Sequence, residues 1–448
     1  MIIEKIIDTL CRNKFEAYLA GGAVRDMLLG LEPSDTDVVT DARTEDIRRI
    51  FRGFKVVAAG KSFKVNFIDG IEVATYRNSV SSEKPVSLQT DLKRRDLTIN
   101  SMALCPYSGD LTDPFGGLND LKNKIIRFTQ NPEARIKEDP CRIVRACRFL
   151  SKIDGVFDPD SLAAMRHYKR MVKGQVAPER IRLEIMKALE YAKPSIFFNA
   201  LQSVGVLADI LPTLNRCVGL DGGQYHDETV FTHCMMVGDS LSPQRKRLRL
   251  AGFLHDTGKA KTIRIHNGRV RFIGHEKATD RLMADLKMLR FTISELTYIQ
   301  ALINLHMRRI ETDTSPKAVR RFLAACQERQ IDYTDHLRMA IADRKGNLAK
   351  PDYTQTQLKM ICKRIRTELS GAQPGAFGLT DLALTGRDVM RIMKISQGPA
   401  IGKMLGKLLT AVIDNPHLNT PEHLAALILN EKTLYTTKKS HRVLRFIQ

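Results

Sequence analysis

The stretch that decides the fold begins with LAGGAVRDMLLG at residues 19–30 and continues with SDTDVV at residues 34–39. The first part predicts the end of a strand, a turn on Gly21 and Gly22, and a helix that starts directly after them. Glycines let backbone N–H groups approach an anion closely, and Arg25 lies in the first turns of the helix, where it can meet a phosphate. A Gly-Gly turn can also be purely structural, so the carboxylates that follow decide between the two interpretations.

Two carboxylates, Asp35 and Asp37, alternate in the second part of this stretch. In a strand, alternate residues share a face, so these side chains point the same way and repel each other unless a cation lies between them. Hard divalent ions with oxygen ligands, above all Mg²⁺, suit such a pair, and two of them can activate a hydroxyl and stabilise a leaving pyrophosphate. Glu72 could add a third carboxylate or lie on the surface. An isolated Asp-x-Asp can equally be a solvated turn.

The wider pattern changes character near residue 131. Before it, short β-branched segments at 56–59, 64–68 and 71–76 predict strands, and the dipeptide Asp69-Gly70 predicts a hairpin between the last two. After it, apolar residues recur at helical spacing to the end of the chain. We therefore expect an α+β head, with a mixed sheet and helices, followed by a mostly α-helical body.

Composition limits the kind of partner. The chain has 448 residues, enough for about three domains, and a net charge of +21, which favours nucleic acid over a basic surface kept only for solubility. No run of 18 apolar residues and no signal peptide is present, and the eight cysteines form no CxxC pair. We expect a cytoplasmic protein with reduced thiols that does not enter membranes.

Five motifs in order resemble those of class II tRNA nucleotidyltransferases and the related bacterial poly(A) polymerases, which implies a polymerase-β-like head. They are GGAVRDMLLG with DTD (21–30 and 35–37), RRDLTINSMA (94–103), DPFGGL (113–118), EDPCR (138–142) and PERIR (178–182).

The resemblance implies roles for the head residues. Asp35 and Asp37, with Glu72 as a further catalytic carboxylate, would hold Mg²⁺ ions that activate an RNA 3′-hydroxyl against the α-phosphate of a nucleotide. Asp96 is a partner for the ribose 2′-hydroxyl. The full nucleotide-binding set is Gly21, Gly22, Arg25, Arg94, Arg95, Asp96, Asn100, Asp139, Arg142 and Arg145.

Asp139 and Arg142 are three residues apart, which on a helix places them on one face. A carboxylate accepts from an exocyclic amine and an arginine donates to ring nitrogens and carbonyls, so the pair could recognise a base edge; a surface salt bridge is the alternative. In the family that the motifs resemble, this pair acts as a protein template that selects CTP or ATP.

Only 13 residues, 78–90, lie between Arg77 and Asp91. Family members that add the full CCA sequence usually have a longer flexible loop there, so the short segment favours addition of two C residues. A poly(A) polymerase, which shares the head motifs, is the alternative function.

A second group of residues resembles the HD phosphohydrolase superfamily, with the sequences LHDTGK (254–259), GHE (274–276) and ADR (342–344). The resemblance implies a first metal site of His233, His255, Asp256 and Asp343, and a second that involves His275 and His306. It also implies metal-activated hydrolysis of phosphate esters, including 2′,3′-cyclic phosphates at RNA ends. A mixed nitrogen and oxygen shell suits Ni²⁺, Mn²⁺, Mg²⁺ or Fe.

The expected domains are a head (1–130), a helical neck with the base-reading motif (131–222), an HD domain (223–367) and a helical tail (379–448). The tail could clamp tRNA through phosphate contacts. Its basic side chains are Lys403, Lys407, Lys438, Lys439, Arg442 and Arg445. The expected partners are tRNA, CTP and ATP, with the protein a monomer or homodimer.

Overall fold

The computed structural model describes residues 2–33, 37–59, 65–76, 86–370 and 377–431. These fall into two compact units, one made of residues up to Asn215 with Met288–Arg290, and one made of Arg216–Lys287 and the chain from Phe291 onward. Among the residues described, no helix has both the length and the apolar character needed to span a lipid bilayer. Asp35, most of segment 78–90, and the last four basic residues of the tail lie outside the described residues.

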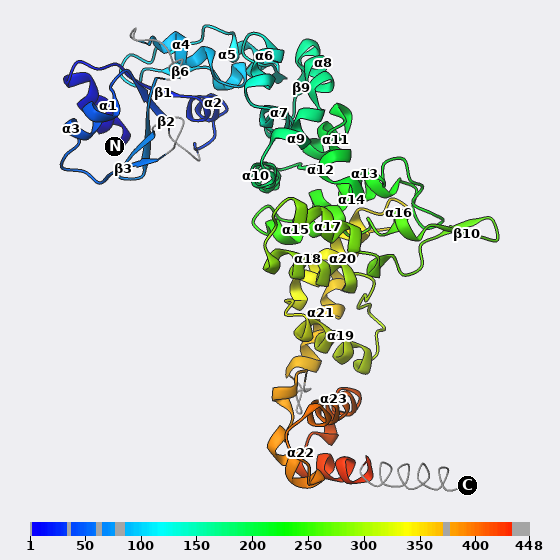
Figure 1. Ribbon diagram of the computed structural model, residues 1–448. Coiled ribbons are helices and arrows are strands. Elements are labelled where there is room, and N and C mark those ends of the chain that lie inside the picture. Colours follow the sequence, from blue (N-terminus) through cyan, green and yellow to red (C-terminus); the bar gives the residue numbers. More distant parts are fainter. Residues whose placement is uncertain (1, 34–36, 60–64, 77–85, 371–376, 432–448) are drawn as a thin grey trace. The chain divides into compact units, whose positions relative to one another are not determined.

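The first unit opens with a mixed sheet in the order β3-β4-β5-β2-β1-β6-β7, with short helices beside it (Figure 1). The strands are β1 (Ala17–Ala20), β2 (Asp37–Thr40), β3 (Val56–Ala59), β4 (Val65–Ile68), β5 (Ile71–Thr75), β6 (Ala103–Leu104) and β7 (Leu111–Thr112). The helices of this part are α1 (Ile2–Arg12), α2 (Gly22–Leu28), α3 (Thr44–Ile50), α4 (Leu88–Lys93), η1 (Thr98–Asn100) and α5 (Gly117–Lys122).

The hairpin expected at Asp69-Gly70 is present. β4 and β5 pair antiparallel with Ile68 opposite Ile71, and both turn residues have positive φ, 47° and 87°. Two consecutive positive φ values are typical of a turn that matches the twist of the flanking strands, and Asp-Gly adopts it at low cost. Because β5 then pairs parallel with β2, the hairpin brings Glu72 next to the acidic strand.

The rest of the first unit is helical, apart from the short parallel pair β8 (Ile125–Ile126) and β9 (Val156–Phe157). Its helices are α6 (Pro132–Glu138), α7 (Cys141–Ile153), α8 (Pro159–Tyr168), α9 (Arg170–Gln175), α10 (Pro178–Ala188), α11 (Ser195–Val204), α12 (Leu207–Ile210) and α13 (Pro212–Asn215). The central helix α7 is buried along most of its length and packs against α10 and α11. It therefore forms the core of this part.

Where the structure describes it, the second unit is helical except for one hairpin, β10 (Arg264–His266) and β11 (Arg269–Arg271). Its first helices are α14 (Val230–Ser240), α15 (Lys246–Leu254), α16 (Lys259–Thr262), η2 (His275–Lys277), α17 (Asp280–Met288), α18 (Ile293–Leu305), α19 (Pro316–Glu328), α20 (Tyr333–Lys345) and α21 (Gln355–Ser370). The candidate metal ligands come from α14, η2 and α20 and from the ends of α15 and α18. The α+β fold class expected from the sequence is confirmed.

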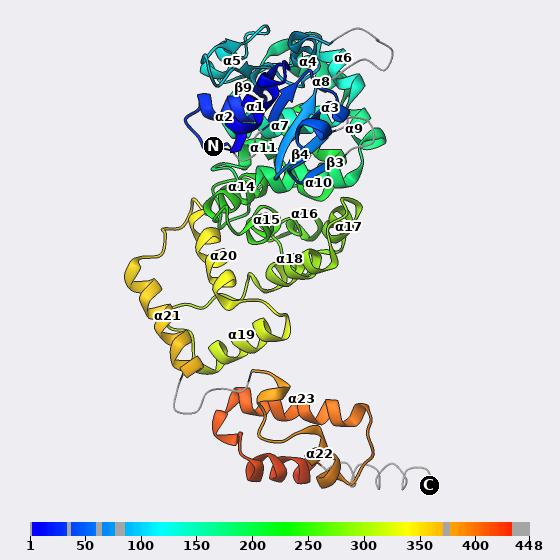
Figure 2. The same ribbon diagram turned by 90° about the vertical axis from the view of Figure 1, so that its left-hand side faces the viewer.

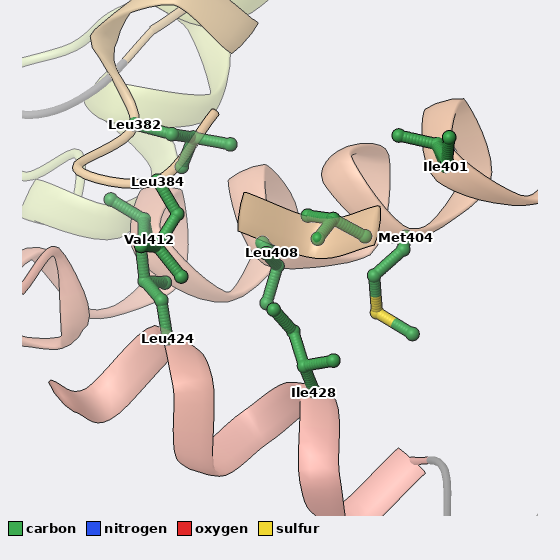
Figure 3. Close-up of a cluster of buried hydrophobic side chains, with 9 residues drawn as sticks. Leu382, Leu384, Ile401, Met404, Leu408, Val412, Leu424 and Ile428 are labelled. Atoms are coloured by element: carbon green, nitrogen blue, oxygen red, sulfur yellow. The ribbon is translucent and has the colours of Figure 1, made fainter. Parts of the chain in front are cut away.

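The tail has a hydrophobic cluster of its own. Its elements are η3 (Leu379–Asp381), α22 (Gly386–Met393), α23 (Pro399–Asp414), η4 (Pro416–Leu418) and helical residues 421–431. Helices α22 and α23 pack on each other (Figure 2). The close-up shows Leu408 and Val412 of α23 pointing toward Leu424 and Ile428 (Figure 3). Lys407, one of the basic residues of the tail that the structure describes, pairs with Glu431 at 2.5 Å.

Candidate functional site

The glycine turn of the head is held tightly against an arginine. Gly21 has φ 69° and its N–H donates to the Met102 carbonyl at 3.1 Å. A Cβ on Gly21 would lie 2.3 Å from Nη1 of Arg95 and 3.5 Å from Oδ2 of Asp37. Any side chain here would displace one of these groups, which explains why the position needs glycine. The turn, Arg95 and Asp37 therefore form one small site.

Asp37 and Glu72 lie side by side on neighbouring strands. The register of the parallel pair β2–β5 places them opposite each other, so both side chains leave the same face of the sheet. Asp37 also pairs with Ala20, the last residue before the turn. Two carboxylates on one face are a donor set that suits Mg²⁺, so the described residues fit the ion that the sequence predicts.

A chain of buried polar contacts runs behind this site. Arg25 Nη1 donates to Oδ1 of the Asn100 side chain at 2.5 Å, and Nδ2 of the same side chain donates to Oδ1 of Asp96 at 3.0 Å. Arg145 donates to the other oxygen of Asp96 through Nε and Nη2, both at 2.8 Å. Although burial alone raises the pKa of a carboxyl, these bonds and the charge of Arg145 lower the pKa of Asp96. Four residues predicted from sequence are thus brought together: Asp96 accepts from Asn100 and Arg145, and Asn100 in turn accepts from Arg25.

Arg94 and Arg95 have different roles in this arrangement. Arg95 is buried and its Nε donates to Asp91 at 3.2 Å, which fixes it beside the glycine turn. The backbone carbonyl of Arg94 accepts from Arg142 at 3.1 Å. Arg94 therefore connects the head motif to the base-reading motif through its main chain.

The expectation that Asp139 and Arg142 share a helix face is wrong. Asp139 ends helix α6 in an extended conformation, φ −153° and ψ 97°, and α7 begins only at Cys141. Pro140 explains the break, because a residue before proline is disfavoured in the helical region. Asp139 is instead held by Arg180, whereas Arg142 donates to Glu138 at 2.7 Å.

Sequence reasoning missed other charged residues near these motifs. Arg148 pairs with Glu184 and Tyr191, and Lys152 Nζ lies 2.8 Å from Asp26. The only sequence signal was their helical spacing along α7. They link α7 to α10 and to the helix that follows the glycine turn.

The four residues expected to hold a first metal ion of the HD domain are brought together and buried. His233 Nε2 lies 3.0 Å from Asp343 Oδ1 and 3.7 Å from Asp256 Oδ2. His255 Nε2 lies 3.4 Å from Asp256 Oδ2 and 3.8 Å from Asp343 Oδ1. Burial by itself raises the pKa of Asp256, but the nearby His255 and Lys259 hold it well below its ordinary value. The carboxylate is therefore ionised, which is the state that metal binding requires.

The two remaining histidines approach the other oxygen of the same carboxylate. His275 and His306 place Nε2 3.1 and 3.5 Å from Oδ1 of Asp256, and 3.2 Å from each other. Asp256 thus directs one carboxylate oxygen toward each pair of histidines.

The histidine orientations test whether the site fits a metal. Three of them donate Nδ1–H to the carbonyl three residues earlier: His255 to Gly252 at 2.9 Å, His275 to Phe272 at 2.8 Å and His306 to Ile303 at 2.6 Å. A carbonyl can only accept, so in the neutral form of each ring the lone pair is on Nε2, which faces inward, as is typical of metal-binding histidines. Nε2 of His255 is buried with no hydrogen-bond partner. These donors fit a divalent metal.

Around the ligands lie residues that the sequence analysis did not identify. Glu228 contacts His233 Nδ1 at 3.1 Å and His226 Nδ1 at 2.7 Å. Lys259 Nζ lies 2.7 Å from Asp256, and Arg309 pairs with Asp343. His226 and Glu228 stand a few residues before His233, and this local clustering of His and Glu was a usable signal.

Comparisons with known proteins match the chain in three consecutive parts. Residues 17–127 match the model described as "Poly A polymerase head domain", residues 156–217 match "Probable RNA and SrmB- binding site of polymerase A", and residues 224–345 match "HD domain". The first contains the Gly21 turn with Asp37 and Glu72, and the last contains the candidate metal ligands.

Full-length relatives and solved structures agree with this layout. A Multifunctional CCA protein of Xylella fastidiosa is 36% identical over 273 residues, 56% of this chain and 64% of that protein. The crystal structure of the Bacillus stearothermophilus CCA-adding enzyme in complex with CTP has a TM-score of 0.71 at 23% identity and covers 97% of this chain and 98% of that one, which shows a shared fold. A Multifunctional CCA protein of Paracidovorax citrulli is 32% identical over 420 residues, 87% of this chain and 95% of that protein. On this evidence the chain belongs to the class II tRNA nucleotidyltransferases that contain an HD domain.

Proposed function

We propose that this protein adds nucleotides of the CCA sequence to tRNA 3′ ends, from CTP and ATP and without a nucleic-acid template. The observation that carries the proposal is the pairing of Asp37 with Glu72 beside the Gly21 turn and the buried Arg95. The RNA 3′-oxygen attacks the α-phosphate, a P–O bond forms, and pyrophosphate leaves. Mg²⁺ held by Asp35, Asp37 and Glu72 would activate the hydroxyl and stabilise the departing charge.

The arginine network supplies the nucleotide site in this proposal. Gly21, Gly22 and Arg25 would contact the triphosphate, while Arg94, Arg95 and Asp96 would contact sugar and phosphates. Asn100 and Arg145 hold Asp96 in place as an ionised acceptor, which is the state that a ribose hydroxyl would donate to.

Choice of base falls to Asp139 and Arg142. Cytosine and adenine both present an exocyclic amine, from which an ionised carboxylate can accept a hydrogen bond. The two side chains have separate supports, Arg180 for Asp139 and Glu138 for Arg142. We propose that they recognise the base from the ends of two successive helices.

The length of segment 78–90 favours an enzyme that stops after two C residues, whereas the names of the relatives favour all three additions. Poly(A) polymerase activity is the alternative, because the head model bears that description. Incubation of tRNA lacking CCA with each labelled nucleotide, followed by sizing, separates the outcomes. Two added residues support CC addition, three support CCA addition, and a ladder of A residues contradicts the proposal. Asp35→Ala should abolish incorporation in the same assay.

For the HD domain we propose metal-dependent hydrolysis of phosphate esters at RNA ends, including 2′,3′-cyclic phosphates. The inward-facing Nε2 atoms and the two anionic carboxylates support it. His233, His255, Asp256, Asp343, His275 and His306 would hold a divalent transition metal or Mg²⁺, which would supply an activated water. Removing a terminal phosphate would restore the 3′-hydroxyl that the head requires.

A further inference from the structure

The β10–β11 hairpin of the second unit has two unlike faces. Its register pairs Arg264 with Arg271, Ile265 with Val270, and His266 with Arg269. Because alternate residues of a strand share a face, one face bears the apolar pair and the other bears all the basic residues. The basic face consists of Arg264, His266, Arg269 and Arg271.

The positive charges of this basic face are not balanced by nearby acidic side chains among the described residues. None of its four side chains makes an ion pair with another residue in the described part of the chain, and all four residues are exposed. Like charges directly opposite each other on neighbouring strands destabilise a hairpin. Figure 1 shows the hairpin extending away from the helices of its unit. Such a surface has the charge and exposure to contact an extended polyanion.

The base of the hairpin is part of the HD site. Phe272, directly after β11, accepts from Nδ1 of the candidate ligand His275 at 2.8 Å. Lys259, one turn before β10, lies 5.3 Å from the Phe272 ring centroid and 2.7 Å from Asp256. The cationic strands are therefore continuous with the metal site.

We propose that the β10–β11 hairpin binds the phosphate backbone of an RNA whose 3′ end occupies the HD site. The inference rests on the proposed hydrolysis and narrows its substrate to a polymer. Arginine matches phosphate with paired hydrogen bonds, and such contacts position a nucleic acid without selecting its sequence. A mononucleotide bound at the metal site has no further phosphates for the hairpin to contact.

The test compares two substrates of the full-length, metal-loaded protein: tRNA ending in a 2′,3′-cyclic phosphate, and 2′,3′-cyclic AMP. In the triple variant Arg264→Gln, Arg269→Gln, Arg271→Gln, we expect kcat/KM on tRNA to fall about tenfold or more at low salt. The slope of log kcat/KM on tRNA against the logarithm of the salt concentration should decrease in magnitude by about two to three. Hydrolysis of 2′,3′-cyclic AMP should stay unchanged.

Two controls accompany the variant. Arg48→Gln, Arg52→Gln, Lys55→Gln removes the same charge from an exposed part of the head, and Ile265→Thr changes the other hairpin face; both should hydrolyse tRNA normally. Equal loss on both substrates, or no loss on tRNA, overturns the inference.

Hydrogen exchange separates failure of this inference from failure of the proposed activity. RNA should protect the amides of residues 264–271 in the wild-type protein, even if that protein hydrolyses neither substrate. Absence of protection overturns the inference independently of activity.

Discussion

Arg180 holds both carboxylate oxygens of Asp139, with Nη1 2.9 Å from Oδ1 and Nη2 2.6 Å from Oδ2. Partial burial alone raises the pKa of Asp139, but the Arg180 bonds lower it, so the side chain stays an ionised acceptor. Bidentate pairing also fixes the plane of the carboxylate. This pair links the EDPCR motif (138–142) to the PERIR motif (178–182).

Substituting Arg180 should therefore weaken nucleotide selection. We expect Arg180→Ala to lower kcat/KM for CTP about tenfold to a hundredfold, because a charge-assisted hydrogen bond contributes about 1.5–3 kcal/mol. Arg180→Lys keeps the charge but not the bidentate geometry and should lie in between. Steady-state incorporation with each nucleotide measures both effects. Wild-type kcat/KM in Arg180→Ala would contradict the positioning role.

Gly21 and Gly30 form a matched pair for testing the turn. Both have positive φ, 69° and 71°, but a Cβ on Gly30 would meet nothing within 4 Å. Alanine at either site should cost about 1–2 kcal/mol of backbone strain and lower the midpoint of thermal unfolding. Only Gly21→Ala should also raise the KM for nucleotides, since it alone displaces Arg95. Equal KM values in the two variants would show that this contact is irrelevant.

The carboxylates of β2 and β5 should be required for chemistry and not for RNA binding. Asp37→Asn and Glu72→Gln keep the side-chain size but remove the anionic metal ligand, so incorporation should fall about a hundredfold or more. Filter binding of tRNA should change little. Full activity of Glu72→Gln would contradict a catalytic role for Glu72 and would show that it is only a structural neighbour of Asp37.

The two activities should be separable by one substitution. Asp256 contacts four of the candidate histidine ligands, so Asp256→Ala should abolish hydrolysis of cyclic phosphates and reduce bound metal, measured by elemental analysis. Nucleotide incorporation should remain at the wild-type rate. Retained hydrolysis with normal metal content would refute the assignment of the HD site.

Because of His336, we expect the stability of the second unit to fall at acidic pH. Burial lowers its pKa to about 4, its Nε2 donates to Leu305 at 2.9 Å, and its Nδ1 is buried without a partner. Since its unfolded pKa is about 6.5, the unfolded state binds the proton first, and stability falls as pH drops from 6.5 toward 4.

Between pH 7 and 5 this residue should cost about 2 kcal/mol of unfolding free energy. His336→Gln keeps a donor for Leu305 and should flatten the pH dependence by that amount, as measured by urea unfolding at both pH values. Identical pH dependence in both proteins would exclude His336 as the source.

Much of the head was predictable because its signals are local. Asp69-Gly70 determines a turn by its own backbone preferences, and the strand segments on both sides are β-branched. The contact between Asp37 and Glu72 needed one more step, since parallel pairing joins strands that are distant in sequence. The composition of β5 gave no information about its neighbour.

The incorrect expectation at Asp139 has a different origin. Residue spacing was treated as helical, although Pro140 indicated a break at that point. Arg180 was in a recognised motif, but its partner lies 41 residues earlier, a distance at which spacing carries no geometric information. Glu228 was missed because it supports a ligand without being part of a motif, and Lys259, although it ends the LHDTGK motif, was given no role.

The three histidines that bond to the carbonyl three residues before them have a consequence for how the metal arrives. Each ring is oriented by its own stretch of main chain, so the binding site is preorganised before an ion binds. Removal of the ion by a chelator should then leave the fold intact, in contrast to small zinc modules that unfold without their ion. Exchange of one bound ion for another would then be a local event that needs no refolding of the second unit.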